Sequence, residues 1–180
     1  MCGVQSALAG QAAILIDEGH CSEAEPLLLE SIELCKELGV KDVCAEEINL
    51  GLIYDKRGNS DKAFAHYKKA EQVAREIKSP FRLAESIGFQ ACVHAKKGNK
   101  SKAMELYRKE ERICRKLGEK SRLWQSLANQ AVLLVGRYEF DSALKKASEA
   151  LGIVEKNGYS GYVEELNMLL AQINAGPRIF

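Results

Sequence analysis

Few side chains in this 180-residue chain have the types and the spacing that catalysis requires. The closest nucleophile and base are Cys92 and His94, which lie two positions apart. Residues two apart on a helix do not face each other, so this pair cannot act as a nucleophile with its general base. Carboxylates such as Glu110 and Glu111 are direct neighbours, and their side chains diverge for the same reason. We therefore expect no enzymatic activity.

Motifs for cofactors and metals are missing from the sequence. It contains no G-x-x-x-x-G-K-[ST], no H-E-x-x-H and no G-x-S-x-G, and none of its six cysteines forms a C-x-x-C pair. We expect no cofactor and no metal. The cysteines fit reduced thiols that serve as small apolar side chains. The start, MCGVQSALAG, lacks the basic segment of a secretory signal, and no apolar run is long enough to span a membrane. These features predict a cytoplasmic protein without a membrane segment.

The formal net charge of +1 hides an uneven distribution. Residues 1–55 hold 2 Lys and Arg against 11 Asp and Glu, whereas residues 56–122 hold 19 against 8. A basic middle could bind nucleic acid or another polyanion, and it could favour self-association with the acidic part of a second chain. Aromatic groups for stacking on bases are sparse there, which argues against nucleic acid. We expect a monomer rather than a self-associated species.

The chain repeats itself with a period of about 40 residues, within the range that is typical of helical repeat proteins. The segment LIYDKRGNSDKAFAHYKKA, which starts at residue 52, aligns with CVHAKKGNKSKAMELYRKE, which starts at residue 92. Ala24, Ala63, Ala103 and Ala143 recur at intervals of 39, 40 and 40. Apolar residues within each unit follow helical spacing, and a glycine interrupts them in the middle. Each unit is therefore predicted to be a pair of helices that must stack on its neighbours.

Several local signals mark the ends of these helices. Gly58 breaks the first helix of the second unit, and Asn59 or Ser60 can cap the next one. Pro80 is predicted to mark the loop after that helix. In the third unit we expect helices near 83–97 and 100–117.

The repeated residues resemble the tetratricopeptide repeat family. The second unit carries the resemblance best, with Leu50, Gly51, Tyr54, Gly58, Ala63, Tyr67 and Ala70 at the family's characteristic positions. The period is longer than the family's usual length of about 34 residues, and it resembles the repeats of kinesin light chains and of the Leu-Gly-Asn G-protein regulators. The fourth unit departs from the pattern, because Tyr138 stands where the turn glycine belongs.

The resemblance implies an all-α fold, an α-α superhelix of four helix pairs with a C-terminal capping helix. We expect one solenoid domain over residues 1–180. Its repeats would cover 5–40, 44–79, 84–119 and 124–158, and the capping helix would cover 162–173. No polar cap precedes the first unit, so we expect the chain to be a fragment of a larger protein.

In function, the resemblance implies a protein–protein interaction scaffold that holds a peptide or helix of a partner in a concave groove. The groove would be lined by first helices, at Asn49, Leu52, Asp55, Phe89, Cys92, Asn129 and Val132. An Asn amide can donate to a peptide carbonyl and accept from a peptide N–H, so Asn49 and Asn129 could hold extended backbone. The carboxylate clamp of co-chaperone domains is not matched, because Ala9 and Ala13 occupy two of its positions.

Overall fold

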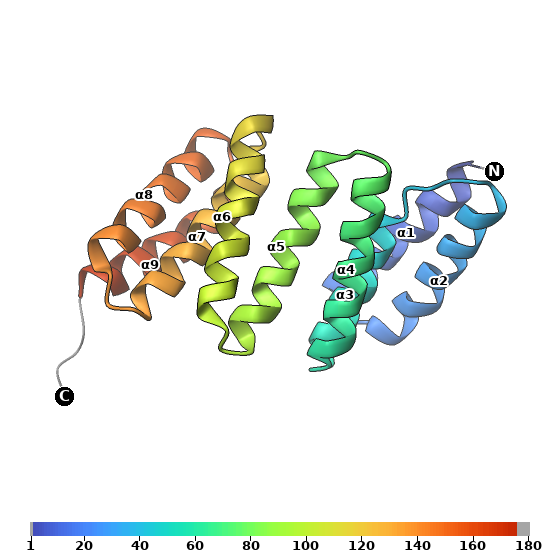
Figure 1. Ribbon diagram of the computed structural model, residues 1–180, viewed down its shortest axis with the longest axis horizontal. Helices are drawn as coiled ribbons and strands as arrows, with labels where there is room; N and C mark the ends of the chain where they lie inside the picture. The colour runs from blue at the N-terminus through green and yellow to red at the C-terminus, as the bar shows by residue number, and fades with distance from the viewer. Residues whose placement is uncertain (1, 176–180) are drawn as a thin grey trace. The chain divides into compact units, whose positions relative to one another are not determined.

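The residues fold into helices that follow one another in pairs. The structure, a computed structural model, describes residues 2–175, and the side chains of residues 4–175. Over this range it contains nine α-helices, one short 3₁₀ helix and no strand. The elements, shown in Figure 1, are α1 (Cys2–Asp17), α2 (Cys21–Glu37), α3 (Cys44–Lys56), α4 (Ser60–Glu76), α5 (Pro80–Lys96), α6 (Lys100–Leu117), α7 (Lys120–Val135), α8 (Phe140–Lys156), η1 (Ser160–Tyr162) and α9 (Val163–Asn174). The predicted all-α class is confirmed.

The chain divides into two compact units, and the boundary between them falls inside α5, after Val93. In unit 1, α1 packs on α2 and α3 packs on α4. In unit 2, α7 packs on both α6 and α8, and α8 packs on α9. The predicted capping helix is α9, which begins one residue later than expected.

The turns explain why the pattern of glycines recurs. Gly58 follows α3 with a φ of 76°, and the Asn59 side chain then accepts a 3.1 Å hydrogen bond from the backbone N–H of Lys62 to cap α4. Each second helix is followed by a residue in the left-handed conformation: Gly39, Lys78, Gly118 and Gly158. Tyr138 adopts the same conformation, with a φ of 63°, in place of the missing glycine.

One boundary prediction was wrong. Pro80 is the first residue of α5 rather than a loop residue, so α5 begins earlier than the predicted start near 83. The first position of a helix suits proline, because its φ is already helical and no intrahelical hydrogen bond is lost there.

Small residues lie where the paired helices meet. Ala24, Ala63, Ala103 and Ala143 are all fully buried. Gly51 on α3 lies directly under the ring of Tyr67 on α4, and a Cβ atom added to Gly51 would overlap that ring. The core of unit 1 is built around such contacts, with Ile48, Ala63, Tyr67, Ala70 and Val93 in one cluster.

Candidate functional site

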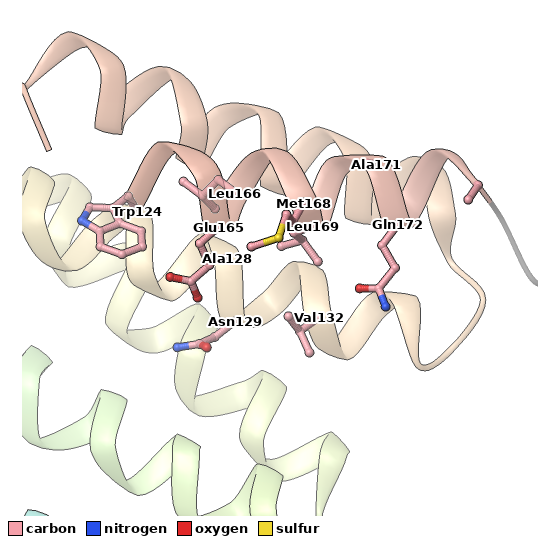
Figure 2. A pocket seen from close by; sticks show the side chains of 11 residues that line it. Trp124, Ala128, Asn129, Val132, Glu165, Leu166, Met168, Leu169, Ala171 and Gln172 are labelled. Carbon is pink, nitrogen blue, oxygen red and sulfur yellow. The ribbon is translucent and has the colours of Figure 1, made fainter. Parts of the chain in front are cut away.

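A groove runs between α7 and α9 in unit 2. We call it the α7–α9 groove, and it encloses about 960 Å³. Figure 2 shows the side chains that line it, from Trp124, Ala128, Asn129 and Val132 on α7 and from Glu165, Leu166, Met168, Leu169 and Gln172 on α9. Two of the predicted site residues, Asn129 and Val132, therefore line the same groove. Leu169 joins them because it lies one repeat after Asn129, at the corresponding position of the next first helix.

The α7–α9 groove is apolar in character with a few polar groups. Val132 and Met168 are 55% and 62% exposed, which is high for apolar side chains of this size. The ring of Trp124 packs on Tyr162 at a centroid distance of 4.5 Å and thereby joins α7 to η1. The amide of Asn129 is half-buried in the lining. Exposed apolar side chains beside an amide suit a peptide, which offers both apolar side chains and backbone hydrogen-bonding groups.

The other five predicted site residues belong to unit 1. Asn49, Leu52 and Asp55 lie on α3, whereas Phe89 and Cys92 lie on α5. All five are half-buried. Phe89 stacks on Tyr67 with ring centroids 5.1 Å apart, and both Leu52 and Phe89 pack against the core cluster around Tyr67. These two side chains thus contribute to the packing of unit 1 as well as to its accessible surface.

Sequence reasoning missed a buried polar network that recurs in both units. In unit 1, the Gln90 amide donates to the Glu71 carboxylate at 2.9 Å, and Lys68 and Arg75 donate to the same carboxylate at 2.8 and 2.6 Å. In unit 2, the Gln130 amide donates to Glu111 at 2.8 Å. The signal was available, because Glu71 and Glu111 occupy equivalent positions of successive repeats, and so do Gln90 and Gln130.

The network changes the acidity of its central carboxylate. Burial by itself would raise the pKa of Glu71, but the hydrogen bonds from Lys68, Arg75 and Gln90 outweigh it and lower this pKa from 4.5 to about 2. Burial acts in the same direction on Glu111, and there hydrogen bonds from Lys146, Gln130 and Arg115 lower the pKa. Both carboxylates are therefore charged at neutral pH, and they tie helices together instead of transferring protons.

Over the side chains that the structure describes, no three His, Cys, Asp or Glu residues come close enough to hold a metal ion. Over the same residues, none of the helices has the length and the apolar character that crossing a membrane requires.

The helices form pairs in register, a residue in the left-handed conformation follows each helix from α1 to α8, and small residues lie at the helix contacts. These features define a helical repeat fold of the tetratricopeptide type. The family model for the tetratricopeptide repeat matches residues 41–116. The chain is thus similar to tetratricopeptide repeat proteins in this segment and in its fold, and such repeats are generally protein–protein interaction modules that are typically not catalytic.

Several solved structures share this fold. BtubC (BKLC) from P. vanneervenii has a TM-score of 0.79 and 20% identity, over 92% of this chain and 70% of that one. The kinesin light chain-type protein of Podosopora anserina, with nearly identical TPR-like repeats, has a TM-score of 0.65 and 16% identity, over 94% of each chain. A signal transduction ATPase with a tetratricopeptide repeat sensor from Pyrococcus horikoshii has a TM-score of 0.75 and 13% identity, over 92% of this chain and 26% of that one.

These likenesses concern the fold, since the identities are low. The predicted resemblance to kinesin light chain repeats is confirmed. No curated protein matches the sequence.

Proposed function

We propose that this chain is an interaction scaffold that binds a peptide or helix of a protein partner along its first helices, and that the α7–α9 groove is part of the binding surface. The observation that carries the proposal is the exposure of Val132 and Met168 in one groove beside the half-buried amide of Asn129. Single exposed apolar side chains are ordinary, whereas apolar side chains that line a groove together with a few polar groups suit a ligand.

The chemistry of the groove suits a peptide better than a small polar ligand. Apolar side chains of the partner would cover Val132, Met168 and Leu169, and the Asn129 amide would pair with its backbone. Each lost amide contact should cost about 0.5–1.5 kcal/mol, which is up to about tenfold in affinity. In unit 1, Asn49 occupies the corresponding position and would make the same type of contact.

The test uses peptides selected for binding to the wild-type chain from a displayed random library. Their affinities are then measured for the groove variant Asn129→Ala with Met168→Glu, and for a control variant, Lys109→Ala with Lys116→Ala, on α6. We expect the groove variant to lose at least about tenfold in affinity for most peptides, because a carboxylate at 168 would be desolvated by an apolar side chain. We expect the control to bind as the wild type does.

Circular dichroism checks that both variants keep their helices. Peptides that bind the groove variant normally but lose affinity for the control would overturn the proposal. A library that yields no binders to the wild-type chain would also count against it.

A further inference from the structure

Unit 2 contains a second groove, which lies along α6 and is completed by Arg137 and by Lys146 of α8. This groove encloses about 750 Å³. Five cationic side chains line it, namely Arg108, Arg112, Arg115, Arg137 and Lys146, and we call it the basic groove. A smaller cavity of about 360 Å³ shares Arg108, Arg115 and Lys146 with it. Two carboxylates, Glu105 and Glu111, complete the charged lining.

Some of these charges already have partners within unit 2. The buried carboxylate of Glu111 accepts hydrogen bonds from Arg115 at 2.8 Å and from Lys146 at 2.7 Å. Arg115 also donates to Glu149 at 2.7 Å. Glu105 pairs with Lys102 at 2.8 Å. Both carboxylates of the lining are therefore neutralised without Arg108 or Arg112.

Arg108 and Arg112 are the cations of the basic groove that remain uncompensated. Both are exposed on α6, four residues apart, and neither has an ion pair or hydrogen bond with any side chain of residues 4–175. Like charges at this spacing repel each other and destabilise a helix. Arg137 adds a third guanidinium, and among the described side chains it contacts the hydroxyl of Ser101 at 3.2 Å and the carboxylate of Glu139 at 3.9 Å. Guanidinium groups that converge on one concavity match carboxylates, which they bind through two parallel hydrogen bonds.

The corresponding positions one repeat earlier lack this arrangement. Lys68 is the equivalent of Arg108 in the preceding repeat, and it pairs with Glu71 at 2.8 Å. Gln72 is the equivalent of Arg112, is uncharged, and donates to Glu76 at 2.9 Å. The uncompensated arginines are therefore a feature of this groove and not a general property of the repeat.

We propose that the basic groove binds an acidic segment of a protein partner, whose Asp or Glu carboxylates pair with Arg108, Arg112 and Arg137. The lining favours such a segment over nucleic acid, because none of the described residues that line either cavity is aromatic and bases would have nothing to stack on.

The test measures binding of a fluorescein-labelled hexaglutamate peptide by fluorescence anisotropy, in about 50 mM and about 500 mM NaCl. Unlabelled hexaglutamate, a hexaglutamine peptide and a hexathymidylate oligonucleotide are the competitors. The groove variant is Arg108→Gln with Arg112→Gln. Its matched control, Lys116→Gln with Lys120→Gln, removes the same charge from exposed positions that do not line the basic groove.

We expect the wild-type chain to bind hexaglutamate at low salt and to lose most of this binding at high salt. The groove variant should bind at least about tenfold more weakly, whereas the control should change by less than about threefold. Hexaglutamine should not compete. The proposal is wrong if hexaglutamate does not bind at low salt, if both variants weaken equally, or if the oligonucleotide displaces the peptide at lower concentration than hexaglutamate itself.

Discussion

At the scale of single residues, the missing side chain of Gly51 decides how closely α3 approaches α4. The ring of Tyr67, which is 1% exposed, occupies the space that a Cβ atom would need. Protein interiors are close-packed, so neither the ring nor the backbone can move away without cost. The Leu-Gly pair that identifies the family in the sequence therefore has a direct packing reason here.

The variant Gly51→Ala should destabilise the protein by about 1–3 kcal/mol, because the added methyl overlaps the ring of Tyr67. The matched control is Gly152→Ala in α8, where an added Cβ meets no atom within 4 Å. This control should be neutral or stabilising by up to about 1 kcal/mol, since alanine is the better helix former. Urea unfolding of both variants provides the measurement. Equal stability of the two variants would show that Gly51 and Tyr67 are not in contact.

At the scale of helices, the buried network around Glu71 joins α4 to α5 within unit 1. Glu71 is 7% exposed, yet its carboxylate is charged because Lys68, Arg75 and Gln90 all donate to it. Since its pKa is lower in the folded state than in the unfolded chain, the unfolded chain binds more protons in acid. The stability that Glu71 contributes is then complete above its unfolded pKa of about 4.5 and is lost as the pH falls toward 2.

We therefore expect Glu71→Gln to remove part of the acid sensitivity of the protein. Between about pH 5 and about pH 2, the free energy of unfolding should fall by about 2–3 kcal/mol less in this variant than in the wild type. Urea titrations at these pH values measure the difference. Glu76→Gln, on the exposed end of the same helix, is the control. The network has no such role if Glu71→Gln keeps the wild-type slope, or if the control loses the slope as well.

At the scale of the whole molecule, stability in a repeat protein is expected to be local, because each repeat contacts only its neighbours. Leu127 in unit 2 and Ile53 in unit 1 are both fully buried apolar side chains, so a defect can be introduced separately into either unit. Truncation of such side chains typically costs about 2–5 kcal/mol.

Leu127→Ala should accelerate amide hydrogen exchange in α7 and α8 and leave exchange in α3 and α4 close to that of the wild type. Ile53→Ala is the reciprocal variant and should do the opposite. Exchange followed by mass spectrometry of peptic fragments gives the answer for each helix. Uniform acceleration along the chain in both variants would show that the molecule unfolds as one cooperative unit.

Much of this fold follows from the sequence. The glycine at most turns, the alanine at the helix contacts and the apolar spacing between them are local features, and the repetition made each one visible several times. The cap at Asn59 and the final helix α9 could be predicted for the same reason. Pro80 was assigned to a loop because proline ends some helices and begins others, and local sequence alone does not distinguish the two.

The sequence by itself determined the all-α class, the pairing of helices and the register that brought Asn129, Val132 and Leu169 to one face. Only the tertiary structure decided which faces meet. Gln90 pairs with Glu71, and Lys146 neutralises Glu111, although the members of each pair are distant in the chain. In the same way α9 completes a groove whose other side is α7. Helical periodicity tells which side a residue occupies, but charge pairing and cavity shape depend on distances between helices. For that reason the sequence shows Arg108 and Arg112 only as members of a basic segment. The structure distinguishes them, because the carboxylates that line the same groove pair with other cations.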